Sequence, residues 1–175
     1  ATHTVGTVVR IHQPQRQEGH VQFIAEGIRR FRIVRWVSEK PPYLVQVEYP
    51  VQLAEPPDQI KAYGHAIINT IKELLPLNPI YKEQLRYFLD RFNPEEASPL
   101  TDFSALLTSA SNTQLQEILE TVPLLKRMEK TLLLLRKEIE LAGMQTQIRQ
   151  KVEEQMNARQ KEFFLREQLK AIQKE

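Results

Sequence analysis

Few residues of this chain have the type and spacing that catalysis, metal binding or cofactor binding requires. There is no cysteine, and the four histidines lack the spacing with one another and with carboxylates that a metal site needs. The five glycines are scattered and form no GxxxxGKS or GxxxxGKT loop to cradle a phosphate. The serines stand in predicted turns, caps and helix faces, without a motif that supplies a general base. We therefore expect no catalytic residue, no metal site and no cofactor site in this chain.

Two groups of residues have the chemistry to bind a partner, and the first group is apolar. Phe163 and Phe164 are adjacent, so on a helix their side chains point about 100° apart and do not both fit one narrow seam. Met144 and Met156 are flexible, polarisable side chains that suit an adaptable surface. The predicted contact site for unfolded polypeptide or for a neighbouring protomer comprises Met144, Met156, Phe163, Phe164 and Leu165. Simple packing is the commoner role of such side chains and stays the alternative.

The second group is basic and lies on one predicted strand. Arg29, Arg30, Arg32 and Arg35 follow one another closely, with aromatic residues interleaved. Such a strand is able to bind phosphate and therefore nucleic acid. The alternative is a solvated strand face paired with nearby glutamates such as Glu48. We favour the solvated face, because nucleic-acid-binding modules normally carry a larger basic excess than the net charge of +2 found here.

The element that must carry the apolar group is a very long C-terminal helix. The chain has no proline after Pro123 and only one glycine, Gly143, in a stretch rich in strong helix formers. A helix of about 50 residues spans about 75 Å, more than a compact domain of this size needs. Its first half predicts a coiled-coil-like seam, whose residues are Leu125, Met128, Leu132, Leu135 and Ile139. Leucines occupy every position from 132 to 135, which predicts burial there on more than one side.

The element that must carry the arginines is a sheet within residues 1–54. Alternating apolar residues predict strands on both sides of a polar turn at Pro14–Gly19, with a bulge or bend at Gly27. A further period-2 run extends from Val45 to Leu53. These strands are too few to close a barrel, so we expect an open edge that promotes association.

Helices are predicted between the sheet and the long helix. Pro56-Pro57-Asp58 precedes an apolar helical face that extends to Leu75, and a second helix is expected over residues 80–92. Ser98 before Pro99 predicts the cap of a third helix, and Ser111 with Gln114 predicts a capping box for a fourth. The expected fold class is α+β: a partial antiparallel β-rich subdomain (1–56), a helical bundle (57–122) and a very long C-terminal helix (123–175).

Three stretches of the chain resemble one known family. The last thirteen residues, FFLREQLKAIQKE (163–175), closely resemble the segment just before the ATPase module of Lon-family ATP-dependent proteases. The stretches VGTVVRI (5–11) and EGIRRFRI (26–33) resemble strand motifs of the Lon N-terminal domain, in the same order. The resemblance therefore covers essentially the whole chain. It implies that the family's opening strands, ATPase module and protease domain are absent from this sequence.

The resemblance also implies a function. Lon proteases are homohexameric hydrolases that use ATP and Mg, cleave with a Ser–Lys dyad, and degrade misfolded, damaged and regulatory proteins in quality control and the stress response. This chain then corresponds to a non-catalytic region for substrate recognition and assembly. The expected location is the bacterial cytoplasm, with the mitochondrial matrix as the alternative, and no apolar run is long enough to span a membrane. A purely structural coiled-coil scaffold and a nucleic-acid-binding adaptor remain the alternative functions.

Overall fold

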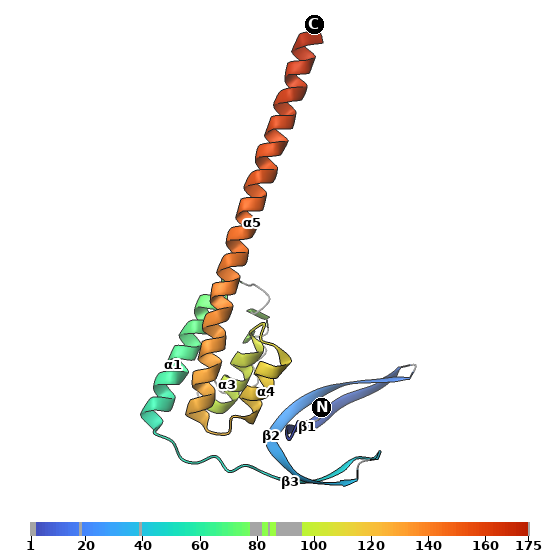
Figure 1. The fold of residues 1–175 in the computed structure, drawn as a ribbon, viewed down its shortest axis with the longest axis vertical. Coiled ribbons are helices and arrows are strands. Elements are labelled where there is room, and N and C mark those ends of the chain that lie inside the picture. Colours follow the sequence, from blue (N-terminus) through green and yellow to red (C-terminus); the bar gives the residue numbers. More distant parts are fainter. Residues whose placement is uncertain are drawn as a thin grey trace.

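The computed structural model describes residues 3–17, 19–38, 40–77, 82–83, 85–86 and 96–174 of the chain. Strands β1 (Val5–Gln17), β2 (His20–Ser38) and β3 (Leu44–Glu48) come first. Helices α1 (Pro57–Leu74), α3 (Ala97–Leu106) and α4 (Asn112–Glu120) follow, and α5 (Leu124–Lys174) is the last element. In Figure 1 the sheet lies beside one end of the helical bundle, and α5 extends far beyond the other end. The expected α+β class is confirmed, whereas the three predicted domain boundaries stay predictions.

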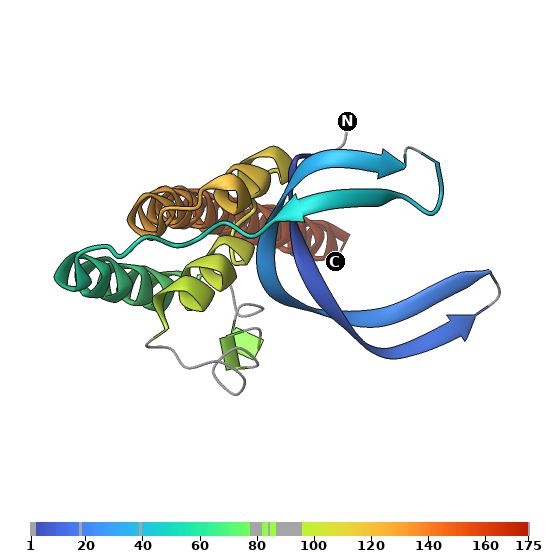
Figure 2. The same ribbon diagram turned by 90° about the horizontal axis from the view of Figure 1, so that it is seen from below.

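The sheet consists of two hairpins that share the long strand β2. The first part of β2 pairs with β1 and its last part pairs with β3, both antiparallel. The two ladders meet at Arg32, which lies opposite Val5 on one side and Glu48 on the other. Figure 2 shows the strands of the two hairpins diverging from this shared centre. The ladder between β1 and β2 shifts register where Val8 and Val9 face Arg29 and Gly27, which confirms the predicted bulge.

Two predicted strand limits are wrong. The turn expected at Pro14–Gly19 is much shorter, because β1 continues to Gln17 and Gly19 takes the turn with a φ of 85°. A second shift in register, between His12 and Gln15, accommodates Pro14, which has no amide hydrogen for the ladder. The run predicted to reach Leu53 ends at Glu48, because Pro50 cannot continue the ladder.

The core of the molecule lies between α1, α3 and α5. Its buried apolar members are Ile67, Ile71, Leu74, Leu100, Leu107, Leu124, Met128, Leu135 and Ala142. The predicted apolar face of α1 is confirmed, since its inner residues belong to this cluster and Ile60, Tyr63 and Leu75 pack around it. The helix predicted over 80–92 lies mostly outside the described residues. Within that range the structure describes 82–83 and 85–86, and these residues are helical.

The helix caps follow the local sequence only in part. The predicted capping box of α4 is confirmed, because the Ser111 side chain accepts from the Gln114 amide and the Gln114 side chain accepts from the Ser111 amide. The predicted cap at Ser98 is wrong, since α3 begins at Ala97 and its N-cap residue is Glu96. Ser98 Oγ instead accepts a hydrogen bond from Arg127 Nη2 at 2.6 Å. Similarly, the N-cap residue of α1 is Pro56, and Asp58 lies within the first turn.

The predicted long helix is confirmed as one continuous element, but its seam is shifted. Met128 and Leu135 are fully buried, as predicted, whereas Leu125, Leu132 and Ile139 are half-buried at the edge of the contact. The buried positions of α5 are Leu124, Arg127, Met128, Thr131, Leu135, Glu138 and Ala142. Of the four consecutive leucines, Leu135 is fully buried, Leu132 and Leu134 are half-buried, and Leu133 is 66% exposed. The predicted burial on more than one side therefore holds for three of them, and Leu133 faces solvent.

The hydroxyl of Thr131 gives a prediction about stability. Thr131 is fully buried, and its Oγ1 has no hydrogen-bond partner in the described part of the chain. An unpaired buried hydroxyl destabilises the folded state, so T131V should raise the free energy of unfolding by about 1 kcal/mol. The control is T70V, because the equally buried Thr70 donates to the Ala66 carbonyl at 2.8 Å and should gain nothing. Urea unfolding of both variants measures the difference, and equal effects would contradict the interpretation.

Candidate functional site

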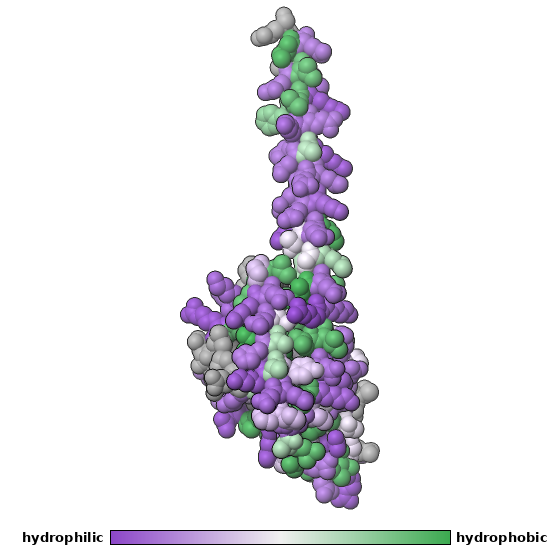
Figure 3. Space-filling model, turned by 90° about the vertical axis from the view of Figure 1, so that its left-hand side faces the viewer, coloured by the Kyte–Doolittle hydropathy of each residue, from purple (hydrophilic) through white to green (hydrophobic). Residues whose placement is uncertain are grey.

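The exposed half of α5 carries all five residues of the predicted apolar contact site. We call residues 143–174 the arm. Every residue from 147 to 170 is exposed, so the arm makes no core with the rest of the chain. Met144, Met156, Phe163, Phe164 and Leu165 are each more than half exposed. In the space-filling view of Figure 3, apolar patches interrupt a mainly hydrophilic arm.

The apolar residues of the arm form a stripe that widens toward its end. Four apolar residues of the arm occur at intervals of four: Met144, Ile148, Val152 and Met156. They lie on one side of the helix, and each is rotated slightly about the helix axis from the one before. Phe163, Phe164 and Leu165 then cover an arc of about 200°, since successive residues differ by about 100°. One ion pair within the helix, Arg166 with Glu162 at 2.7 Å, brackets these three residues, and a second, Lys170 with Glu167 at 2.9 Å, follows them. The arm is therefore amphipathic and presents an apolar surface to solvent.

The sheet exposes a second apolar surface, which the sequence analysis missed. Strands with alternating apolar residues normally bury one face, and the sequence pattern predicts the same here. Among the described residues of the sheet, however, Val5 is the buried apolar one. The exposed apolar side chains include Val9, Ile11, Phe23, Ile24, Ile28, Val34 and Trp36. The sequence signal for this surface is that both faces of β2 carry large apolar residues, whereas a sheet with one solvated face carries them on the buried face alone.

The four predicted arginines do not form one basic surface. Arg29 lies over the ring of Tyr49, with its guanidinium carbon 3.4 Å from the ring centre. Arg32 pairs with Glu48 at 3.3 Å, which confirms one of the expected pairings on the solvated face. The side chain of Arg30 extends from β2 to the helices, where it contacts the Leu119 carbonyl. Arg35 lies farther along β2 and is exposed. The four arginines therefore do not form the continuous phosphate-binding strand that the sequence suggested.

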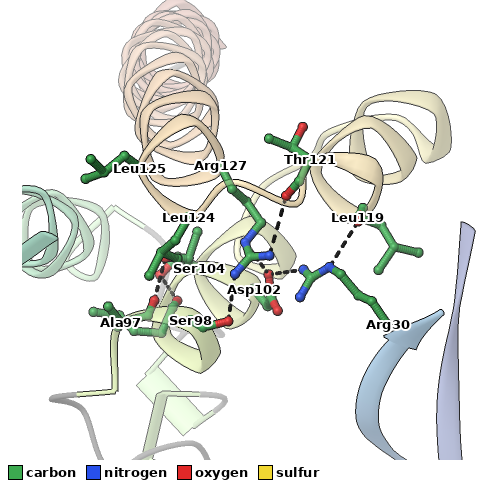
Figure 4. A network of polar contacts seen from close by, with 12 residues as sticks. Arg30, Ala97, Ser98, Asp102, Ser104, Leu119, Thr121, Leu124, Leu125 and Arg127 are labelled. Carbon is green, nitrogen blue, oxygen red and sulfur yellow. Dashed lines mark hydrogen bonds and ion pairs between the residues drawn. The ribbon is translucent and has the colours of Figure 1, made fainter. Parts of the chain in front are cut away.

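Arg30 joins a polar network that connects the sheet to the helices (Figure 4). Its Nε donates to the Leu119 carbonyl at 3.0 Å, and its Nη2 donates to Asp102 Oδ1 at 2.5 Å. The same oxygen lies 3.3 Å from Nε of Arg127 on α5. Arg127 also donates to Ser98 Oγ and to the Thr121 carbonyl. One carboxylate thus lies between two guanidinium groups from elements that are far apart in the sequence.

The charge of Arg127 is unusual because only 2% of this residue is exposed. Burial lowers the pKa of Arg127; the carboxylate of Asp102 opposes this shift, and the positive charge of Arg30 adds to it. The group nevertheless keeps its proton, since arginine remains charged in proteins. The carboxylate of Glu55 raises the pKa of Arg127 slightly, but it accepts from the Leu124 and Leu125 amides and so caps the start of α5.

Comparison with known proteins identifies the family. Residues 1–137 match the family described as "ATP-dependent protease La (LON) substrate-binding domain". The chain belongs to this family. It is 49% identical to Lon protease 2 of Hydrogenovibrio crunogenus over 97% of its own length, and 45% identical to the Lon protease of Magnetococcus marinus over 98%. It is also 37% identical to a mitochondrial Lon protease homolog of Ostreococcus lucimarinus over 99%.

The matches cover only part of each relative. This Lon substrate-binding chain spans 20%, 22% and 19% of the lengths of those three proteins. The N-terminal domain of a Mycobacterium avium complex Lon protease has the same fold, with a TM-score of 0.61 and 24% identity over 76% of this chain and 70% of that one. The relatives are thus both bacterial and mitochondrial, and the resemblance inferred from the sequence is confirmed.

Two further observations concern chemistry and membranes. Among the residues that the structure describes, no three His, Asp or Glu side chains come together as a metal site. Within the same residues, no helix is long and apolar enough to cross a membrane.

Proposed function

We propose that this chain recognises unfolded segments of protein substrates for a Lon protease and that the arm supplies the contact surface. The observation that carries the proposal is the exposed apolar stripe of the arm, which follows the substrate-binding match at residues 1–137. Native proteins bury the large apolar side chains that damaged or unfolded proteins expose. A surface of Met, Phe and Leu therefore distinguishes the two states without reading a particular sequence.

Weak binding by each arm is sufficient if several arms act together. Methionine and phenylalanine adapt to many apolar partners, so each contact is individually weak and unselective. Several arms in one assembly raise the effective concentration of binding sites for a long unfolded chain. For the whole protein we propose a homohexameric ATP- and Mg-dependent serine protease in the bacterial cytoplasm, in which this region also contributes to assembly.

A structural scaffold is the second candidate function. The same amphipathic stripe suits contact between the arms of neighbouring protomers, as in a coiled coil. Self-association that does not depend on unfolded protein would favour this function. Nucleic-acid binding is the weaker alternative, because the arginines that suggested it are dispersed among Tyr49, Asp102 and Glu48.

The test replaces the apolar residues of the arm by serine. A variant with M144S, M156S, F163S and F164S should bind a chemically unfolded protein at least about tenfold more weakly, because it loses several buried apolar contacts worth about 1 kcal/mol or more each. Binding of the same protein in its native form should be weak for both chains. Fluorescence anisotropy of the labelled unfolded protein measures the affinity, and sedimentation measures self-association.

The control changes four exposed glutamines of the arm, so that helix propensity falls in a comparable way. The variant with Q145S, Q155S, Q160S and Q168S should keep its affinity for the unfolded protein. Both variants should keep the thermal unfolding transition of the bundle, because the arm is exposed. Unchanged binding by a folded apolar variant would reject the arm as the contact surface, and loss of self-association alone would favour the scaffold.

A further inference from the structure

A groove lies between the sheet and the helices, away from the arm, and the proposed function does not use it. Its volume is about 290 Å³, and its walls come from β2, from the segment after β3, from α3 and from the start of α5. The polar side chains that line it are Arg29, Arg30, Gln52, Ser98 and Arg127, beside the ring of Tyr49. Three guanidinium groups therefore line one groove, and none of its lining residues is a carboxylate.

The positive charge in the groove is only partly neutralised. Asp102, which is not among the lining residues, is the one carboxylate that forms ion pairs with Arg30 and Arg127 in the described part of the chain. The hydrogen bonds of these two arginines use four of their ten N–H groups in the described part of the chain. Nε of Arg127 is buried and lies 3.3 Å from Asp102 Oδ1, a contact that does not reach hydrogen-bond geometry. A buried guanidinium with unused donors favours an additional anionic partner.

The third arginine is held at the exposed edge of the groove. Arg29 stacks on Tyr49, which restricts its guanidinium to a plane beside the groove. Restricting a long side chain before binding lowers the entropy that binding must remove. Apolar residues, Ile28, Pro50 and Val122, complete the walls. The groove thus combines fixed positive charge with apolar surface.

We propose that this groove binds the carboxylate of an acidic residue within an unfolded polypeptide. The volume is close to the lower limit of about 300 Å³ for ligand pockets, so it accommodates one acidic side chain with part of the neighbouring peptide. Paired guanidinium donors match the geometry of a carboxylate, and the apolar walls accept the neighbouring residues of a peptide. Nucleic acid fits less well, because single-strand binding uses free aromatic faces for stacking and Arg29 covers one face of Tyr49. The inference rests on the proposed function in one respect: the peptide is taken to be part of an unfolded protein substrate.

The experiment measures the preference for a carboxylate and not the total affinity. The probe is a short labelled peptide, amidated at its C-terminus, that carries one Glu between apolar residues. Its counterpart carries Gln at the same position. Anisotropy titrations with the full chain should show about tenfold tighter binding of the Glu peptide, because a charged hydrogen bond to guanidinium replaces a neutral one. The arm contributes equally to both peptides, so the serine variant of the arm should weaken both and keep the ratio.

Two single variants and one matched control locate the preference. R29Q and Q52E should each abolish most of the preference for Glu, the first by removing a donor and the second by placing a competing carboxylate in the groove. R35Q, on the same strand but outside the groove, should leave the ratio within about twofold, as expected for an exposed charge far from the site. Each variant should fold, because Arg29, Gln52 and Arg35 are all exposed. Circular dichroism checks this expectation.

Three results would overturn the inference. Equal affinity for the Glu and Gln peptides would show that the groove does not select carboxylates. An equal loss in R29Q and R35Q would assign the preference to general positive charge. Displacement of the peptide by a single-stranded oligonucleotide, with a dependence on Arg29 and without any preference for Glu, would assign the groove to nucleic acid. Each of these results leaves the role of the arm to its own test.

Discussion

Replacing Leu135 by alanine should lower the free energy of unfolding by about 3 kcal/mol, within the usual range of 2–5 kcal/mol for a buried leucine. Leu135 is fully buried in the cluster that joins α1, α3 and α5. The substitution removes apolar contacts and leaves a cavity that the packed helices cannot fill completely. Chemical denaturation followed by circular dichroism gives the change directly. Because these helices also hold the start of the arm, the variant should lose arm-dependent binding only when it unfolds.

The matched control for this change is two residues away on the same helix. Leu133 is 66% exposed, so L133A makes the same chemical change without forming a cavity. Its effect should stay within about 0.5 kcal/mol, and the better helix propensity of alanine should offset part of it. Similar effects of L133A and L135A would contradict the assignment of the core. This pair of variants therefore tests which side of α5 contacts the bundle.

The variant D102N should lower the free energy of unfolding by about 2 kcal/mol. Asparagine keeps the shape of the side chain but removes the negative charge between Arg30 and Arg127. Breaking a fully buried ion pair costs about 3–5 kcal/mol, and solvent screening reduces the cost here because the Asp102 side chain is 38% exposed. Urea unfolding of the variant and of the original chain at the same salt concentration gives the difference.

The control for the charge change is E48Q, which makes the same acid-to-amide substitution in an exposed pair. Arg32 and Glu48 are both about half exposed, so their pair should contribute at most about 0.5–1 kcal/mol. A double-mutant cycle of D102N with R30Q should show coupling, because the two side chains share a hydrogen bond. Effects of D102N no larger than those of E48Q would show that the network does not connect the sheet to the helices.

The parts of this protein that the sequence predicts well depend on contacts between near neighbours. The long helix follows from the absence of proline after Pro123, and the start of α4 follows from Ser111 and Gln114, only three residues apart. The bulge near Gly27 and the pairing of β1 with β2 likewise come from residues in one hairpin. The exposure of apolar residues on the arm was accessible to the same reasoning, because two adjacent phenylalanines on a helix cannot share one seam.

The polar interior was not accessible to sequence reasoning, because it depends on residues that only the tertiary structure brings together. Arg127, Thr131 and Glu138 occupy buried positions on α5 that an apolar pattern assigns to solvent. Hydrogen bonds from the Ser109 amide and hydroxyl offset the cost of burying the Glu138 carboxylate, and Ser98 is a partner of Arg127 rather than a helix cap.

The division of the arginines has the same cause. Arg29 and Arg30 are adjacent in the sequence, but one stacks on Tyr49 and the other reaches Asp102, 72 residues away along the chain. Local propensity and periodicity determined the elements of this protein, since both arise within a few residues of the chain. Packing of the sheet against the helices decided which charges are buried and where the groove forms, because burial depends on surfaces that meet only in the folded chain.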